Sequence, residues 1–211
     1  MNLKTTLSKL YIVLLIVVNT PVNTYCQVEQ TSLAKHSMIS FVPQFLINNG
    51  IRIDYDRRLN EKHWLQLAPQ FYLREHSVTP DNDVTNKFNR LVGAGLHVYH
   101  RFYPGAGPGH NGVYISYGLT GQYFDMQYDE KILTNSVERY SRITKAGAEI
   151  NVGSTVKFFD LFIVDFFTGL GFKYSFLKTD AVKPKRFNNF YTDYGYTGNI
   201  LNLGVRIGLM P

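Results

Sequence analysis

The sequence predicts an all-β protein of eight antiparallel strands that follow one another up and down. The 211 residues include 15 Tyr, 15 Phe and 17 Gly. That composition has too many aromatics for a disordered chain and too many poor helix formers for a long-helix protein. Charged residues make up 18%, below the ~25% typical of soluble domains. Apolar and polar residues alternate along most of the chain, and this alternation has the period of a β-strand.

The first 26 residues are expected to be a cleaved signal peptide. Lys4 and Lys9 precede the apolar run Leu10–Val18, and small and polar residues follow it, which is the order of a secretory signal. The run is shorter than the ~20 residues that span a bilayer. Two alternatives stay open: a buried N-terminal helix, and acylation of Cys26 in place of cleavage after it.

Cleavage after Cys26 removes the chain's one cysteine and leaves 185 residues. The mature chain then has no disulfide, thiolate nucleophile or cysteine metal site. Loss of two lysines lowers the formal net charge from +6 to +4, so the charge gives little support for a nucleic-acid partner. Residues 27–36 form a short polar lead-in to a single domain at 37–211. A mean hydropathy of −0.15 excludes a polytopic helical membrane protein.

Four alternating segments occupy the first half of this domain. The first, 39–47, ends at Asn48-Asn49-Gly50, a strong hairpin signal because Asn and Gly accept positive φ. The second, 51–56, sets Ile and Tyr on one parity against Arg and Asp on the other. The third, 65–74, alternates Leu, Pro and Phe with Gln, Ala, Tyr and Arg. The fourth, 92–101, sets Val, Ala and Leu against Gly, His, Tyr and Arg.

Four more segments complete the predicted set. Residues 113–122 alternate Val, Ile, Tyr and Leu with Ser, Gly, Thr and Gln. Residues 145–157 and 162–175 alternate apolar side chains with Gly and with charged or polar ones. Residues 201–209 place Leu, Val and Ile against Asn, Gly and Arg. No segment after residue 26 has a helical period.

Alternation does not say which face lies inside a closed barrel. A soluble lipocalin-like carrier would turn its apolar face inward around a ligand, whereas an outer-membrane barrel turns that face outward to lipid. Most predicted strands have ten residues or more, and membrane strands need ~9–11 residues against ~5–6 in globular sheets. Strand length therefore favours an eight-stranded antiparallel up-and-down transmembrane β-barrel.

Loop lengths favour the same conclusion, because outer-membrane barrels have long outer loops and short inner turns. Short turns lie at 60–62 and near Asp160. The hairpin at 48–50 is short for an outer loop and the turn at 104–112 is long for an inner one. The long polar loops are 75–89, 129–141 and 179–197.

The polar face carries opposite charges beside many glycines, which suits the narrow interior of an eight-stranded barrel. We expect the charges to pair, because a lone charge in a dry lumen is costly. The candidate pairs join an Arg at 52, 101 or 206 to Asp54, Glu149 or Asp165. A polar face exposed to solvent is the alternative. The predicted lumen charges are Arg52, Asp54, Asp56, Arg74, Arg101, Lys145, Glu149, Lys157, Asp165, Lys173 and Arg206.

The last segment resembles the terminal-strand signal that the bacterial barrel-assembly machinery reads. Asn202, Gly204, Ile207 and Leu209 fit its pattern, while the tail Met210-Pro211 departs from the usual terminal aromatic. Over about 37–211, the chain resembles the small OmpA-like and OmpX-like outer-membrane barrels, and especially the β-barrel proteins of Bacteroidetes. The resemblance implies a Gram-negative outer-membrane location, with lipid, lipopolysaccharide and the assembly machinery as partners. It rests on architecture, because no diagnostic site motif is present.

The segment 179–197 is the candidate interaction surface. Basic and aromatic side chains together can bind a glycan, lipopolysaccharide phosphates or a protein. The alternative is an aromatic girdle and a loop packed on its own rim. The candidate residues are Lys183, Lys185, Arg186, Phe187, Phe190, Tyr191, Tyr194 and Tyr196.

No catalytic motif, metal-ligand spacing or cofactor motif is found in the sequence. Some eight-stranded barrels edit lipid A and need a His near a Ser and an acid. His97 and His100 are three residues apart and face opposite sides of a strand, so His97 is expected to be a hydrogen-bonded lumen residue. The leading prediction is a non-enzymatic barrel with a structural or surface-interaction role, with a lipid A-modifying enzyme and a soluble carrier as alternatives.

Overall fold

A computed structural model describes residues 37–75, 88–105, 112–132, 135–158, 161–182, 184, 186–188 and 193–210. The chain divides into two units, Met1–Ala34 and Lys35–Pro211, and every described residue lies in the second unit. The predicted signal peptide, residues 1–26, and the lead-in at 27–36 lie outside the described residues.

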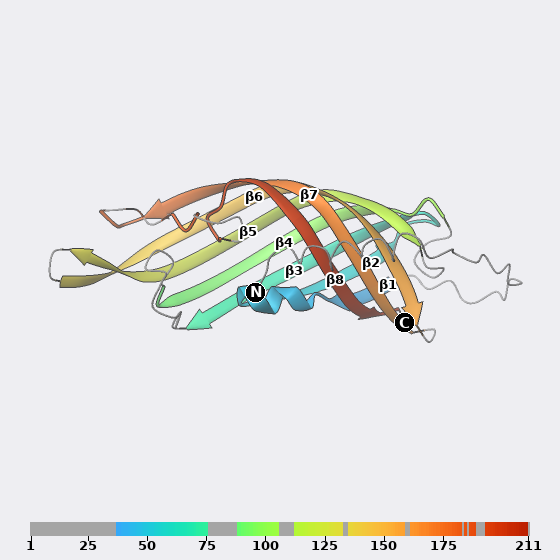
Figure 1. Cartoon of the computed structure of the whole chain (residues 1–211), viewed down its shortest axis with the longest axis horizontal. Helices are drawn as coiled ribbons and strands as arrows, with labels where there is room; N and C mark the ends of the chain where they lie inside the picture. The colour runs from blue at the N-terminus through green and yellow to red at the C-terminus, as the bar shows by residue number, and fades with distance from the viewer. Residues whose placement is uncertain are drawn as a thin grey trace, which may run out of the picture. The chain divides into compact units, whose positions relative to one another are not determined.

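The described chain consists of strands and one short 3₁₀ helix, η1. Each strand pairs antiparallel with the next, and the last pairs with the first, so the sheet closes into a ring (Figure 1). This confirms the all-β prediction of eight antiparallel up-and-down strands. The elements are β1 (Ser37–Phe41), η1 (Pro43–Asn48), β2 (Gly50–Arg58), β3 (His63–Glu75), β4 (Arg90–Phe102), β5 (Val113–Ile132), β6 (Asn135–Phe158), β7 (Phe162–Thr179) and β8 (Gly198–Leu209).

Because neighbouring strands run in opposite directions, the connections between them lie at two ends of the ring. We call the end with the β2–β3 turn the turn rim, and the end with η1 and the β7–β8 connection the loop rim. At the turn rim, the Asn60 side-chain oxygen accepts hydrogen bonds from the backbone N–H groups of Lys62 and His63 at 3.0 and 2.9 Å. This Asx-type turn explains why a few residues suffice between β2 and β3.

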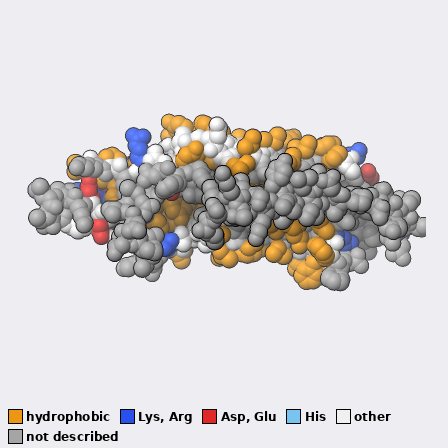
Figure 2. Space-filling view, viewed as in Figure 1, with side chains coloured by type: hydrophobic (Ala, Val, Ile, Leu, Met, Phe, Trp, Pro, Cys, Tyr) orange, Lys and Arg blue, Asp and Glu red, His pale blue; other side chains and the backbone are white. Residues whose placement is uncertain are grey.

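The strand period of two separates the two faces of the sheet, with apolar side chains outside and polar side chains inside. Outward residues run in apolar rows across neighbouring strands. One such row, in pairing order, is Tyr55, Leu67, Val98, Leu119, Ala148 and Phe172. In the view of Figure 2, hydrophobic side chains cover much of the described surface, and charged side chains gather toward its two ends.

The first predicted strand is wrong beyond Phe41. Residues 39–47 were expected to form one strand, but the chain leaves the sheet after Phe41 and forms η1. Pro43 has no N–H for a sheet ladder and its fixed φ suits the start of a helix. Asn49 adopts the left-handed conformation, with φ of 56°, so the Asn-Gly signal ends η1 and starts β2.

The predicted loop at 129–141 is also wrong. β5 and β6 pair residue by residue from Met126 with Ser141 to Ile132 with Asn135. The two paired strands extend as a hairpin past their neighbours (Figure 1). Tyr128 and Glu130 on one face of this hairpin are buried, while Asp129 and Glu138 on the other face are exposed. Charged residues therefore lie on both parities, and the sequence looks like a loop.

Apolar clusters fill the interior at both rims. The loop-rim cluster has Tyr72, Phe88, Leu91, Phe124, Met126, Tyr128, Ile143 and Phe187 at its core. The turn-rim cluster consists of Met38, Trp64, Tyr103, Tyr114, Ile163, Phe167 and Met210. Between the two clusters lies a polar lumen, which contains the candidate site.

Candidate functional site

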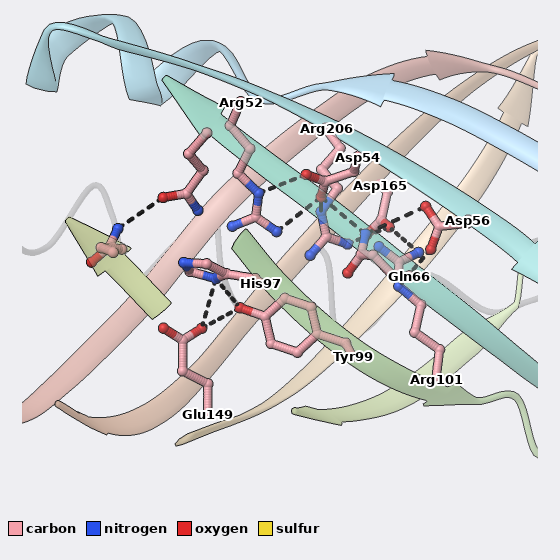
Figure 3. A network of polar contacts seen from close by, with 12 residues as sticks. Arg52, Asp54, Asp56, Gln66, His97, Tyr99, Arg101, Glu149, Asp165 and Arg206 are labelled. Carbon is pink, nitrogen blue, oxygen red and sulfur yellow. Dashed lines mark hydrogen bonds and ion pairs between the residues drawn. The ribbon is translucent and has the colours of Figure 1, made fainter. Parts of the chain in front are cut away.

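Three arginines and three aspartates form the centre of the lumen (Figure 3). They come from β2, β4, β7 and β8, and all six are at most 3% exposed. Their charges balance, which is the condition for burying ions without a large free-energy loss. We call this set the Arg–Asp network: Arg52, Arg101, Arg206, Asp54, Asp56 and Asp165.

Asp54 lies between two guanidinium groups. Arg52 donates two hydrogen bonds to it, from Nε to Oδ1 at 2.6 Å and from Nη2 to Oδ2 at 2.9 Å. Nε of Arg206 is 2.9 Å from Asp54 Oδ2. Gln66 donates from Nε2 to Asp54 Oδ2 at 2.9 Å and to Asp56 Oδ2 at 3.3 Å. The Gln66 amide therefore links two carboxylates that would otherwise repel each other.

Asp165 connects β7 to the opposite wall of the ring. Its carboxylate accepts hydrogen bonds from Arg206 Nη1 at 2.8 Å, Arg101 Nη1 at 3.2 Å and the Tyr114 hydroxyl at 2.7 Å. Nε of Arg101 is also 3.2 Å from Asp56 Oδ1. Contacts that cross the lumen fix the distance between non-neighbouring strands, which a sheet ladder alone does not do.

Aromatic rings also contact the guanidinium groups of Arg101 and Arg206. Arg101 lies 4.7 Å from the centre of the Tyr114 ring, and Arg206 lies 4.0 Å from the centre of the Phe167 ring. A desolvated cation–π contact contributes about 2 kcal/mol. The turn-rim cluster thus packs directly against the Arg–Asp network and excludes water from it.

A second polar group lies on the loop-rim side of the network. The Tyr99 hydroxyl donates to Glu149 Oε2 at 2.5 Å, and Lys173 Nζ is 3.0 Å from Glu149 Oε1. His97 Nδ1 is 2.6 Å from the same hydroxyl. Because the single hydroxyl proton goes to Glu149, Nδ1 donates to Tyr99 and His97 Nε2 remains an acceptor. Nε2 is buried and has no hydrogen-bond partner among the described residues.

A third layer of polar contacts lies nearer the loop rim. Gln122 Nε2 donates to Gln70 Oε1 at 2.8 Å and to the Tyr72 hydroxyl at 3.0 Å. Lys145 Nζ donates to the backbone carbonyl of Asp193, in the β7–β8 connection, at 3.0 Å. Lys145 thereby fastens that connection to the wall of the ring.

The eleven predicted lumen charges thus fall into separate places. Six form the Arg–Asp network, Glu149 and Lys173 pair in the second group, and Lys145 contacts Asp193. Arg74 is half-buried at the loop rim, with its guanidinium 5.8 Å from the centre of the Phe88 ring. Lys157 is half-buried on β6 near the turn rim. Arg74 and Lys157 thus lie toward opposite rims, outside the six residues of the Arg–Asp network.

The structure divides the predicted loop surface. Arg186 is exposed and Tyr196 is half-buried, with its hydroxyl donating to the Asn199 carbonyl at 3.3 Å. Phe187 is buried against Tyr128, with ring centres 5.6 Å apart. Lys183, Lys185, Phe190 and Tyr191 lie outside the described residues.

Tyr194 also packs inward, over the loop-rim cluster. Its ring centre is 5.0 Å from that of Phe124 and 6.3 Å from that of Tyr72. The Tyr194 hydroxyl donates to the Asn48 carbonyl at 3.0 Å. Burial among these rings raises the pKa of the Tyr194 phenol. Phe187 and Tyr194 therefore close the loop rim rather than face outward.

The four residues of the predicted assembly signal lie along β8. Ile207 and Leu209 point outward and are exposed, and Asn202 donates from Nδ2 to Asn151 Oδ1 at 3.2 Å. Gly204 lies under the Gln44 amide and the Phe167 ring, both too close to leave room for a Cβ atom.

Several functional-site residues were not predicted from the sequence. Gln66, Tyr99 and Tyr114 complete the hydrogen bonding of the buried charges. Gln66 and Tyr99 lie on the parity predicted to be polar, beside Arg74 and Arg101 on their strands, and Tyr114 has the parity of Ser116 and Thr120. Parity places these residues on the inner face but does not identify them as partners of the buried charges.

No group of three His, Cys, Asp or Glu side chains among the described residues is arranged to hold a metal ion. His63 Nδ1 and His100 Nε2 are 2.9 Å apart on β3 and β4, a pair remote from His97. No helix in this part of the chain is long and apolar enough to cross a membrane.

The chain matches no known protein-family model and no curated protein.

Proposed function

We propose that the chain is a non-enzymatic β-barrel of the bacterial outer membrane, with a closed, charge-filled lumen and a structural or surface-interaction role. The observation that carries the proposal is the inverted distribution of side chains. On every strand, large apolar residues point away from the ring, and at least one of them is between 47 and 76% exposed. Examples from β1 to β8 are Ile39, Ile53, Phe71, Leu96, Leu119, Ile150, Leu170 and Leu203.

An apolar outer face of this extent is costly in water. Soluble monomers rarely expose apolar patches larger than about 300–600 Å². A lipid bilayer removes that cost and leaves the backbone hydrogen bonds of a closed ring intact. A soluble lipocalin-like carrier needs the opposite arrangement, with the apolar face around the ligand, so the side-chain directions favour the membrane alternative.

The filled interior supports a barrel that does not conduct. The Arg–Asp network occupies the centre, and apolar clusters close both rims. An eight-stranded ring is only wide enough for side chains to fill. Planar-bilayer recordings should show no sustained ohmic current, and large pore-sized currents would refute the closed-lumen proposal.

Electrophoresis of the membrane fraction is the primary test. We expect the protein in that fraction, with a faster-migrating folded band in detergent that shifts on boiling, because a closed sheet resists detergent. Recovery in the soluble fraction without a boiling-sensitive band would contradict the proposal. Sequencing the mature N-terminus tests cleavage after Cys26, and a lipid mass on Cys26 would support acylation instead.

The enzyme alternative has a separate test. A lipid A-modifying enzyme requires a nucleophile or base at the lipid-facing rim, whereas His97 is buried in the lumen with its Nδ1 bonded to Tyr99. Mass spectrometry of lipid A from cells with and without the protein should give the same acyl pattern. A consistent gain or loss of an acyl chain would establish the enzyme alternative.

The interaction role is assigned to the loop rim, where outer loops would meet lipopolysaccharide, a glycan or a protein. The β5–β6 hairpin extends past the ring there, and Val137 and Tyr140 are exposed on it. Arg186 adds an exposed cation on the β7–β8 connection. Deletion of the hairpin tip should leave the folded band unchanged while reducing binding of cells to an immobilised partner.

A further inference from the structure

Few residues pair where β8 meets β1 to close the ring. Only Ile39–Phe41 pair with β8, opposite Ile207–Leu209. Residues 198–206 of β8 pair with β7 on one side, and the described part of the chain offers them no strand on the other. The segment beside them is η1, and the Gln44 amide packs onto Gly204. Side chains of η1, rather than backbone hydrogen bonds, close this part of the wall.

A cavity of about 220 Å³ lies at this place. It is bounded by Gln44 and Phe45 of η1 and by the stretch of β8 that pairs only with β7. Leu201 and Leu203 point outward there and are strongly exposed. The cavity extends inward to the second polar group of the lumen. Its inner lining includes Lys145, Lys173, His97 and Glu149.

The lining carries one more cation than carboxylates, with Arg52, Lys145 and Lys173 against Glu149 and Asp193, and this balance favours an anionic group. Lys145 pairs with Ser175 and Gly147 pairs with Lys173 in the β6–β7 ladder, so the two lysines are diagonal neighbours on the inner face. Such neighbours lie roughly 7–8 Å apart, and an oxyanion between them can accept from both. Each ammonium has three N–H donors. One from Lys145 reaches the Asp193 carbonyl and one from Lys173 reaches Glu149.

His97 supplies a second, independent indication of a ligand. It lines the cavity, is 2% exposed, and its Nε2 has no hydrogen-bond partner among the described residues. Buried acceptors are normally satisfied. An oxyanion without a proton cannot donate to Nε2, so a water molecule bound between the head group and His97 would satisfy this acceptor.

The size and the outer lining favour an apolar tail. Ligand pockets that enclose a small molecule measure about 300–1,000 Å³, so this cavity holds a head group and not a long chain. The remainder of the ligand must pass between Phe45 and the exposed Leu201 and Leu203. Phe45 packs inward against Tyr72, whereas Leu201 and Leu203 face lipid in the proposed function.

We propose that this cavity binds the head group of a single-chain alkyl carboxylate, whose tail leaves the barrel sideways between η1 and β8 into the membrane. The proposal rests on the proposed membrane location, since the tail needs an apolar surrounding. The same opening would give the lumen a lateral route, beside the loop-rim residues Tyr72, Phe124 and Tyr194 that also line the cavity.

The test uses the full chain purified from membranes in a non-ionic detergent, with [1-¹³C]decanoate as the probe. Binding is read from the carboxyl resonance. Decanol has the same chain length without the charge, and acetate has the same head without the tail. The variants are Lys145→Met and Lys173→Met, with Lys178→Met as the matched control, because Lys178 lies exposed on the same strand, β7, as Lys173. The boiling-sensitive band verifies that each variant is folded.

We expect decanoate to bind the wild type and Lys178→Met equally and at least tenfold more weakly to Lys145→Met. Decanol and acetate should each bind at least tenfold more weakly than decanoate. Equal binding of decanoate and decanol, or no change in Lys145→Met, would overturn the proposal. Tight binding of an alkyl phosphate with no binding of decanoate would overturn the choice of a carboxylate head.

A second measurement locates the tail and does not depend on the variants. A photoreactive fatty acid with a diazirine near its carboxyl end should label η1 and residues 200–203 of β8. Even labelling around the outer face would refute the sideways opening. Absence of the folded membrane band refutes the proposed function itself, whereas a folded band without specific labelling refutes only this inference.

Discussion

Replacing Asp165 with Asn removes one of three buried carboxylates while keeping the shape of the side chain. Asp165 is 1% exposed and accepts from Arg206 at 2.8 Å, Arg101 at 3.2 Å and Tyr114 at 2.7 Å. The substitution leaves the Arg–Asp network with three guanidinium groups and two carboxylates. Loss of one partner from a buried ion pair costs about 3–5 kcal/mol, so the free energy of unfolding should fall by that amount.

The assay is urea unfolding in lipid vesicles, followed by tryptophan fluorescence. Trp64 is the one tryptophan of the chain and is 2% exposed in the turn-rim cluster, so its emission reports the loss of the folded interior. The control is Asp125→Asn, because Asp125 pairs with Arg142 at 3.5 Å on a solvent-accessible site. An exposed pair contributes about 0–1 kcal/mol. Equal, small losses for both variants would refute a dry, tightly coupled network.

A compensating change separates charge balance from simple loss of contacts. Adding Arg206→Met to Asp165→Asn leaves two complete pairs, Arg52 with Asp54 and Arg101 with Asp56. The double variant should therefore be less destabilised than the sum of the two single variants. A strictly additive result would show that the buried charges act independently, contrary to the network described above.

The remaining predictions use the same unfolding assay. Leu119→Arg places a charge on the outer face, which the proposed membrane location turns to lipid, and should cost about 2–4 kcal/mol. Tyr140→Arg, on the hairpin beyond the ring, should cost less than about 1 kcal/mol. Equal losses would contradict the proposed membrane location. Phe124→Ala should lower the free energy of unfolding by about 3–5 kcal/mol, as for other buried aromatics, because the Phe124 ring packs on Tyr72 and Tyr194. A loss below about 1 kcal/mol would show that the loop-rim cluster is loosely packed. Gly204→Val should lower the free energy of unfolding by about 1–3 kcal/mol through overpacking. Adding Gln44→Ala to this variant should restore part of the lost stability, because the Gln44 amide occupies the space that a Cβ needs. No restoration would place the strain elsewhere.

The alternating pattern predicts the strands well where each face has one environment. β2, with Arg52, Asp54 and Asp56 on one parity, is an example. The pattern fails where the environment changes along the chain. At Pro43 the missing N–H ends the ladder. On the β5–β6 hairpin charged residues lie on both parities, with Glu130 buried and Asp129 exposed.

The residues of the polar lumen follow from parity, but their partners do not. Arg52 and Asp54 are two apart on one strand, so their pairing is local. Arg101 on β4 and Asp165 on β7 are not neighbours in the sheet, and they meet only because the ring closes. The same holds for Tyr99 and Glu149, whose hydrogen bond crosses from β4 to β6. Sequence patterns describe one strand at a time and contain no information on contacts across a lumen.

The way the interior is filled restricts where this protein can act. In the proposed closed lumen, the apolar clusters at both rims and the balanced charges between them leave no axial route through the described ring. Chemistry that involves the lumen must therefore be reached from the side, and the three-residue pairing of β1 with β8 is the weakest closure there. Interactions that do not involve the lumen fall to the loop rim, where the β5–β6 hairpin stands clear of the sheet. A ligand that competes with decanoate without affecting surface binding would establish that these two sites work independently.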